Sequence, residues 1–161
     1  RIAGLADSKT LSAAKREALF NVIMDKALAV SWVGVEADEC DRLGMQEADI
    51  SGLRRAVVRL GVEPGYVLSD GFPVDGLTVP DLGMWKGDSV CACVAAASIV
   101  AKVASVRIMI AMGAEIPGYD FAVHKGYAAA LLQRRLKELG PSRQHRMSYA
   151  NVRRAARLHS S

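Results

Sequence analysis

Apolar residues recur at helical spacing along most of the chain. In the first such stretch, Leu19, Val22 and Ile23 share one face, and Ser12 stands where its side chain can cap the helix N-terminus. The same spacing predicts helices over residues 12–26, 36–43, 50–60, 89–112 and 128–139. The pattern therefore indicates a chain in which helices make up most of the regular structure.

Short apolar runs between these helices predict strands. Residues 29–35 are rich in β-branched side chains, residues 66–70 form an apolar run that ends at Asp70, and residues 84–88 are expected to form an edge strand. Helices that alternate with strands indicate an α/β fold. These strands are few for a stable sheet, so either the pattern misses further strands or the first strands of the sheet precede this chain.

The composition is that of a globular domain. Of the 161 residues, 51% are hydrophobic and 24% are charged, which allows a sizeable core and opposes disorder. The most apolar run, residues 90–106, contains Ser98, Lys102 and Ser105, so we expect a buried helix rather than a membrane span. Residues 1–8 lack the basic and apolar regions that a signal peptide requires.

The three cysteines, Cys40, Cys91 and Cys93, include no C-x-x-C pair. An odd number of cysteines without that spacing favours neither a disulfide framework nor a zinc site. We therefore interpret all three as buried or half-buried thiols without a special role, which is typical of proteins in a reducing cytoplasm.

Charge is distributed unevenly between the two halves of the sequence. Residues 1–88 hold 10 Lys and Arg against 14 Asp and Glu, whereas residues 89–161 hold 11 against 3. A basic half beside an acidic half suggests a surface for a polyanion next to a carboxylate site, and a solvated basic helix would give the same excess. Charge alone leaves both interpretations open.

Two aspartates stand where strands are expected to end. Asp70 closes an apolar strand and is followed by glycine, and Asp88 comes just before the long helix. Because sites in α/β sheets form beyond the carboxyl ends of strands, both are candidates to bind a divalent cation through oxygen. The alternative roles are a helix N-cap for Asp88 and, for the further candidate Asp7, a turn former.

Two basic loops have a composition that suits nucleic acid. Residues 124–127 combine cations with a glycine and Tyr127, and residues 140–146 end in Arg146. Such loops can contact phosphates and stack on a base or sugar, although a loop whose tyrosine packs in the core has the same pattern. Ser98 and Lys102 lie one helical turn apart, but a helix serine and a lysine with a buried stem explain them without a nucleophilic role.

Six segments, in matching order and spacing, resemble motifs of bacterial ribonuclease HII, in particular its actinobacterial branch. They are D-S-K-T-L-S at 7–12, Y-V-L-S-D-G at 66–71, K-G-D at 86–88, A-A-S-I-V-A-K-V at 96–103, P-G-Y-D-F with H-K-G-Y within 117–127, and G-P, H-R and S-Y within 140–149. The segments span nearly the whole chain, so the resemblance is specific.

The resemblance implies a ribonuclease H-like α/β fold, with a mixed sheet flanked by helices and a C-terminal helical part. Residues 1–112 would form the core, and residues 113–161 would form a basic helical region of the same domain. It also implies an endonuclease that hydrolyses the RNA strand of RNA–DNA hybrids and cuts 5′ to ribonucleotides embedded in duplex DNA. The enzyme would be cytoplasmic, monomeric when complete, and unattached to membranes.

The resemblance also assigns residues to this activity. Asp70 and Asp88 would be catalytic and would bind Mg²⁺ or Mn²⁺ in a two-metal mechanism. The residues implied to contact the nucleic acid are Ser8, Lys9, Lys125, Tyr127 and Arg146.

The chain departs from the family pattern at several positions. The D-E-x-G-R-G segment, which supplies two further carboxylates in the family, has no counterpart here, so we expect it to be missing from this chain. Ser105 and Val106 stand where the family has Arg-Asp, residues 128–132 replace G-T-x-x-H, and Tyr149 replaces Phe. Three interpretations stay open: a nuclease, a catalytically inactive nucleic-acid-binding remnant, and a helical scaffold without a nucleic-acid role.

Overall fold

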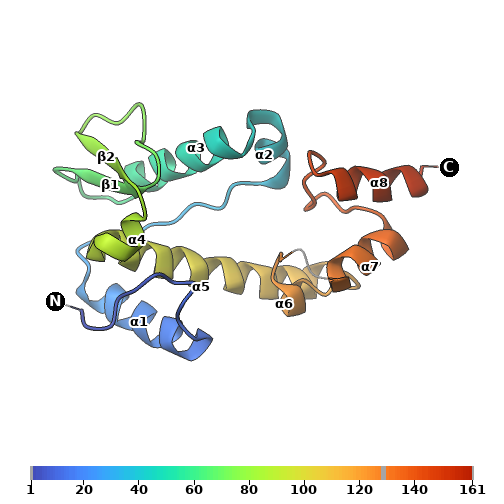
Figure 1. Cartoon of the computed structure of the whole chain (residues 1–161), viewed down its shortest axis with the longest axis horizontal. Helices are drawn as coiled ribbons and strands as arrows, with labels where there is room; N and C mark the ends of the chain where they lie inside the picture. Colours follow the sequence, from blue (N-terminus) through green and yellow to red (C-terminus); the bar gives the residue numbers. More distant parts are fainter. Residues whose placement is uncertain (1, 128–129, 161) are drawn as a thin grey trace. The chain divides into compact units, whose positions relative to one another are not determined.

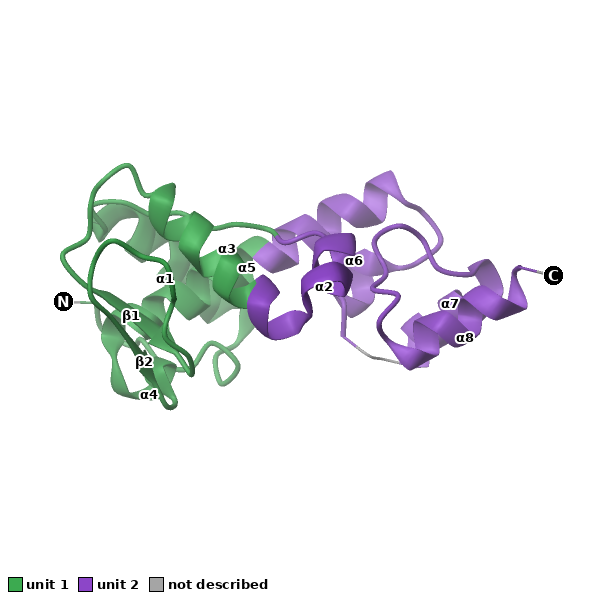
Figure 2. Cartoon of the chain, turned by 90° about the horizontal axis from the view of Figure 1, so that it is seen from above, with its two compact units in different colours: residues 1–34, 49–104 green, residues 35–48, 105–161 purple. Residues whose placement is uncertain are grey.

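The computed structural model describes residues 2–127 and 130–160 as a helix-rich chain with one small sheet (Figure 1). Residues 1–34 and 49–104 form one compact unit, unit 1, and residues 35–48 and 105–161 form a second, unit 2 (Figure 2). Helices α3 (Met45–Val58) and α5 (Ala92–Glu115) contribute residues to both units. The division of one domain into a core, residues 1–112, and a basic helical region, residues 113–161, stays a prediction.

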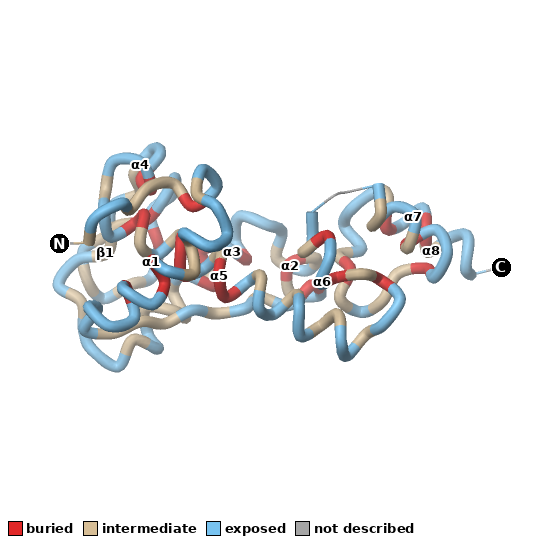
Figure 3. Tube along the Cα trace, turned by 90° about the horizontal axis from the view of Figure 1, so that it is seen from below, coloured by how far each residue is buried: buried red, intermediate tan, exposed pale blue. Residues whose placement is uncertain are grey.

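Unit 1 is built on the packing of α1 (Ala13–Lys26) against the first half of α5. The Ser12 hydroxyl caps α1 by accepting a hydrogen bond from the backbone N–H of Lys15 at 3.3 Å, as predicted. Each helix offers apolar residues at positions i, i+1 and i+4, which lie on one face of a helix. The buried residues are Leu19, Phe20, Ile23, Ile99, Val100 and Val103 (Figure 3). Phe20 takes the place predicted for Val22, which is exposed.

Among the described helices, α5 alone is long and apolar enough to cross a membrane by length and composition. Its residues Ile99, Val100 and Val103 belong to the buried cluster of unit 1. Lys102 and Arg107 also lie along its length. The first half of α5 is therefore packed against α1, as the sequence prediction of a buried helix requires, whereas Ile108 and Ile110 in its second half are exposed.

The sheet consists of β1 (Val67–Asp70) and β2 (Asp81–Met84), which pair in parallel with Asp70 opposite Met84. Residues 71–80 connect the strands and pass close to Gly83, where an added Cβ would lie 2.5 Å from backbone atoms of Phe72 and Pro73. The Asp81 carboxylate fastens this connection by accepting a hydrogen bond from the backbone N–H of Val74 at 2.7 Å. The short crossover is therefore possible because position 83 has no side chain.

The structure corrects two of the predicted strands. Residues 29–35 form no strand, because no described segment pairs with them. The second strand is Asp81–Met84 rather than residues 84–88, and the short helix α4 (Gly87–Val90) follows it. The long helix starts at Ala92 instead of residue 89, because Cys91 has an extended backbone. The strand predicted at 66–70 is confirmed as β1.

Unit 2 contains α2 (Ala37–Leu43), α6 (Phe121–His124), α7 (Ala130–Leu139) and α8 (Ala150–Leu158). The helices predicted at 36–43 and 128–139 are confirmed, although residues 128–129 lie outside the described residues. Helix α8 was not predicted, because its many arginines hide a narrow apolar stripe of Val152 and Ala155. Those two residues pack against Leu136 of α7.

Candidate active site

Asp70 and Asp88 lie at the carboxyl end of the small parallel sheet. Asp70 is the last residue of β1, and its Oδ1 accepts a hydrogen bond from the backbone N–H of Gly87 at 2.7 Å. Gly87 opens α4 and directly precedes Asp88. An added Cβ on Gly87 would lie 3.2 Å from the Ser69 carbonyl oxygen and 3.4 Å from the Asp70 Cα. The glycine therefore lets α4 approach the end of β1 and brings Asp88 beside Asp70.

The turn between β2 and α4 fixes this arrangement. The backbone hydrogen bonds between β1 and β2 continue one residue beyond β1, where the Gly71 N–H donates to the Met84 carbonyl oxygen at 2.8 Å. Lys86 then adopts a left-handed conformation, with φ of 54°, which is uncommon for a residue other than glycine. This reversal turns the chain at once into α4, so Asp88 comes shortly after the end of β2, at the sheet edge where Asp70 ends β1.

The two carboxylates differ in their surroundings. Asp70 is exposed, whereas Asp88 is only 9% exposed and its Oδ1 accepts a hydrogen bond from the Ser89 hydroxyl at 3.3 Å. Carboxylate oxygens are the donors that Mg²⁺ and Mn²⁺ prefer, so the chemistry of this pair fits a hard cation. Among the described residues, no three His, Cys, Asp or Glu gather closely enough to hold a metal ion. By themselves, Asp70 and Asp88 would therefore be an incomplete set of ligands for a metal ion.

The segment at residues 7–10 is a hydrogen-bonded turn in unit 1. The Asp7 carboxylate accepts from the Lys9 N–H at 2.8 Å, and the Asp7 carbonyl oxygen accepts from the Thr10 N–H at 3.0 Å. Asp7 thus acts as the turn former that was its alternative role. Ser8 is buried and its carbonyl oxygen accepts from Arg16, whereas Lys9 is exposed. Of the two residues predicted to contact substrate here, Lys9 has its side chain in solvent.

Lys125 and Tyr127 belong to a loop in unit 2 that His124 holds in place. The His124 Nε2 donates to the Tyr119 carbonyl oxygen at 2.8 Å, and its Nδ1 accepts from the Gly126 N–H at 3.0 Å. These partners make Nε2 the donor and Nδ1 the acceptor of the ring. Lys125 has a left-handed backbone, with φ of 51°, and Tyr127 is 57% exposed. The exposure of Tyr127 rules out the core-packing alternative for this tyrosine.

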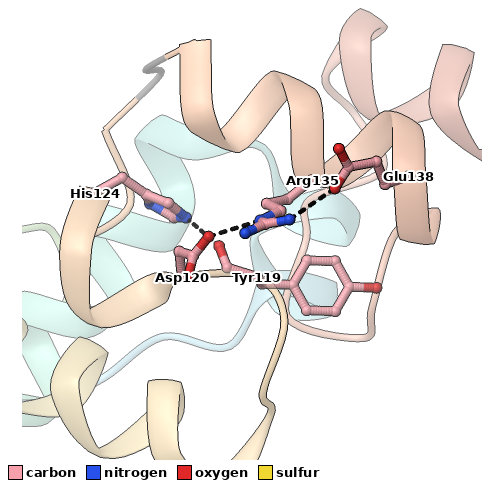
Figure 4. A network of polar contacts seen from close by, with 5 residues as sticks. All are labelled: Tyr119, Asp120, His124, Arg135 and Glu138. Carbon is pink, nitrogen blue, oxygen red and sulfur yellow. Dashed lines mark hydrogen bonds and ion pairs between the residues drawn. The ribbon is translucent and has the colours of Figure 1, made fainter.

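A polar network fastens the same loop to α7 (Figure 4). Arg135 of α7 forms ion pairs with Asp120, at 2.6 Å, and with Glu138, at 2.8 Å. The hydrogen bonds that Arg135 donates to these carboxylates, to Asp120 first, hold the pKa of Arg135 above its ordinary value. Asp120 directly precedes α6, which carries His124. Sequence reasoning missed this network, because no local pattern links residues 120 and 135.

The buried centre of this loop region is aromatic. The rings of Tyr119, Phe121, His124 and His145 lie with centroids 5.0–5.6 Å apart. Tyr119 also donates from its hydroxyl to the Gly140 carbonyl oxygen at 3.0 Å. His124 and His145, both from motif segments, are therefore packing residues in unit 2.

Arg146 lies at the surface of unit 2. Its guanidinium carbon lies 4.5 Å from the centroid of the Tyr149 ring, which is a cation–π contact. The following turn is tied to α2, because the Asp41 carboxylate accepts hydrogen bonds from the backbone N–H groups of Met147 and Ser148. Hydrogen bonding, from Ser148 first, lowers the pKa of Asp41. Arg146 thus presents one face to solvent on an anchored turn.

The Ser98 hydroxyl is bonded to the backbone of its own helix. The Ser98 hydroxyl donates to the Ala95 carbonyl oxygen at 3.0 Å within α5. That bond is ordinary for a serine inside a helix.

The predicted site residues are divided between the two units. Unit 1 contains Ser8, Lys9, Asp70 and Asp88, and unit 2 contains Lys125, Tyr127 and Arg146.

The fold is that of the ribonuclease H class. The crystal structure of the ribonuclease H2 from Pyrococcus horikoshii OT3 matches this chain with a TM-score of 0.74, covering 98% of this chain and 83% of that one. The two sequences are 19% identical, so this likeness bears on the fold alone. It confirms the predicted ribonuclease H-like α/β class.

Sequence comparison narrows the class to a family. A profile described as Ribonuclease HII matches residues 1–152. The ribonuclease HII of Cutibacterium acnes is 96% identical over all 161 residues, which cover 79% of that protein. The ribonuclease HII of Mycobacteroides abscessus is 54% identical over 96% of this chain and 66% of its own length. The chain belongs to the ribonuclease HII family, and its enzyme class is type 2 ribonuclease H, an endoribonuclease.

Proposed function

We propose that this chain supplies the Asp70 and Asp88 part of an active site that hydrolyses the RNA strand of RNA–DNA hybrids and cuts 5′ to ribonucleotides embedded in duplex DNA. The observation that carries the proposal is the hydrogen bond from the Gly87 N–H to the Asp70 carboxylate at 2.7 Å. This bond joins the end of β1 to the residue before Asp88. Family membership supports the nature of the reaction.

Asp70 and Asp88 would hold Mg²⁺ or Mn²⁺ together with carboxylates beyond this pair. A metal pair bound there would activate a water molecule and stabilise the leaving 3′ oxygen. Neighbouring residues of this chain fix the positions of the two carboxylates. The Gly87 N–H orients the Asp70 carboxylate, and the burial of Asp88 restricts the rotation of its side chain. A mobile pair would place the reacting phosphate less accurately.

The nucleic acid would be held by cations and by one aromatic side chain. Lys9 is exposed in unit 1, and Lys125 and Arg146 are partly exposed in unit 2, where they can neutralise phosphates. Tyr127 is exposed on the loop that His124 and Arg135 stabilise, and it would stack on a sugar or base next to the ribonucleotide. Ser8 is buried, so a contact there would involve its backbone rather than its hydroxyl.

The direct test is cleavage of a DNA duplex that contains one ribonucleotide, with Mg²⁺ or Mn²⁺. The enzyme is a polypeptide in which these 161 residues follow the family's D-E-x-G-R-G segment. We expect a single cut 5′ to the ribonucleotide that leaves a 3′ hydroxyl and a 5′ phosphate. Asp88→Asn should abolish it, whereas Asp25→Asn, at an exposed position of α1, should not. Equal activity of the two variants would disprove the role of Asp88.

A second experiment tests the stacking role of Tyr127. Removing a stacking aromatic weakens binding by roughly 1–3 kcal/mol. Tyr127→Ala should therefore weaken binding to ribonucleotide-containing DNA about tenfold or more, and weaken binding to plain DNA less. Fluorescence anisotropy with the two duplexes measures both losses. Equal losses on both duplexes would contradict selection at the junction.

The rival function is that of a catalytically inactive nucleic-acid-binding protein with the same fold. The described residues contain no group of three potential metal ligands. If the rival is correct, the polypeptide with the D-E-x-G-R-G segment still binds the hybrid but fails to cut it at any Mn²⁺ concentration. Metal-dependent cutting that requires Asp70 and Asp88 would exclude the rival.

A further inference from the structure

Cys91 and Cys93 form a thiol pair that the proposed nuclease reaction does not use. Their Sγ atoms lie 3.2 Å apart. Residues i and i+2 of a continuous helix point to different sides, so two helical cysteines at this spacing would not meet. Here Cys91 stands between α4 and α5 with an extended backbone, φ −127° and ψ 122°. This break between the two helices is what turns one thiol toward the other.

Cys91 also stands at the N-terminus of the 24-residue helix α5. Its carbonyl oxygen accepts the Ala95 N–H at 2.9 Å, so it occupies the capping position. Hydrogen bonds from the Cys93 thiol first, and then from the backbone N–H of Val94, lower the pKa of Cys91. A thiolate is the reactive form of cysteine, and helix N-termini favour it. Cys91 is therefore suited to be the attacking thiol of the pair.

Solvent can reach both thiols. Cys91 is partly exposed and Cys93 is exposed, whereas the third cysteine, Cys40, is buried in α2. Redox-active cysteines combine an accessible thiolate with a neighbouring thiol that resolves the first adduct. The pair meets both conditions, whereas Cys40 is buried.

We propose that Cys91 and Cys93 are a redox-active dithiol that closes to an intramolecular disulfide by exchange with a small-molecule disulfide. The Cys91 thiolate attacks one sulfur of that disulfide, whose S–S bond breaks and releases one thiol, leaving a mixed disulfide on Cys91. Cys93 then loses its proton and attacks the Cys91 sulfur, which releases the second thiol. In total the protein loses two electrons and two protons, and the small disulfide is reduced to two thiols.

Closure would act on the neighbouring candidate site. The Sγ atoms must approach from 3.2 Å to about 2.05 Å, which shifts the side chains of the pair at the start of α5. The Cys91 N–H donates to the Gly87 carbonyl oxygen at 2.8 Å, and the Gly87 N–H donates to Asp70. An effect of oxidation on nucleic-acid cleavage rests on the proposed function, whereas the disulfide itself does not.

The test is a thiol count on the 161-residue chain in glutathione buffers of increasing oxidised fraction, with trapping by N-ethylmaleimide and intact-mass measurement. We expect the number of alkylated thiols to fall from three to one, with one peptide that contains a 91–93 disulfide. The Cys40→Ala variant should fall from two to none over the same range of buffers. Three alkylated thiols at the most oxidising ratio, or disulfides only between two chains, would overturn the proposal.

Two further variants test the order of the steps and do not depend on cleavage activity. Cys93→Ser should accumulate the mixed glutathione disulfide on Cys91, because no resolving thiol is left. Cys91→Ser should react with glutathione disulfide at least tenfold more slowly, because it lacks the thiolate at the helix N-terminus. Equal rates of adduct formation in the two variants would overturn the assignment of Cys91 as the attacking thiol.

Discussion

Single residues carry the geometry of the candidate site. Gly83 and Gly87 allow backbone segments to approach closely, and the Gly87 N–H orients Asp70. His124 holds the 125–127 loop through bonds from both ring nitrogens. Each of these residues acts through its size or its hydrogen bonds, so a conservative substitution can test it.

Gly83 should not tolerate a methyl group. An added Cβ would lie 2.5 Å from the Phe72 and Pro73 backbone, and backbone cannot move aside as a flexible side chain can. Gly83→Ala should lower the free energy of unfolding by about 1–3 kcal/mol. Gly65→Ala is the matched control, because no atom lies within 4 Å of its added Cβ. Urea denaturation measures both variants, and equal stabilities would contradict the close crossover.

His145 should make unit 2 sensitive to acid. Burial lowers its pKa below the ordinary value of 6.5, so the folded state favours the neutral ring. Its contribution to stability is present above pH 6.5 and is lost as the pH falls from 6.5 toward the lowered pKa. His145→Phe, which keeps an aromatic ring beside Tyr119, should show a smaller loss of stability over this range. Thermal denaturation against pH checks it, and parallel curves for the two proteins would refute the burial effect.

At the scale of elements, the contact between α1 and α5 is the main apolar contact of unit 1. Ile99→Ala removes a side chain with 0% exposure and should lower the free energy of unfolding by about 2–5 kcal/mol. Ile110→Ala, at a 50% exposed position of the same helix, should cost under about 1 kcal/mol. Denaturant unfolding of both variants tests the contact. A similar loss at the two positions would mean that α5 does not pack on α1 through this face.

Elements with strong local patterns were predictable from the sequence. The Ser12 cap and the apolar spacing gave α1, and the run that ends at Asp70 gave β1. The prediction of a strand at residues 29–35 was wrong, because β-branched residues form a strand only where a partner strand is available. Helix α6 is one turn long and α8 has a narrow apolar stripe, so neither gave a clear periodic signal.

The sequence indicated those residues of the candidate site that belong to motifs, but not the contacts that hold them in place. Asp70 and Asp88 followed from their positions at expected strand ends and from the family motifs. The Arg135 ion pairs and the tie from Asp41 to the 147–148 turn join residues far apart in the sequence. Such pairings depend on the folded chain, and one sequence contains no local signal for them.

At the scale of the whole molecule, the basic charge gathers in the second half of the chain. Residues 89–161 contain 11 Lys and Arg against 3 Asp and Glu. Arg153, Arg154 and Arg157 are exposed on α8, opposite its buried stripe. In the proposed function, the carboxylate pair of unit 1 would bind metal, and exposed cations of unit 2 would bind phosphate.

The central claim is that Asp70 and Asp88 share one metal site. The measurement is Mn²⁺ affinity by electron paramagnetic resonance, in a polypeptide where these residues follow the D-E-x-G-R-G segment. Asp70→Asn and Asp88→Asn should each weaken binding at least about tenfold. The double variant should lose less than the product of the two single losses, because both residues act on the same ions. Losses that multiply, or unchanged affinity in either single variant, would contradict a shared site.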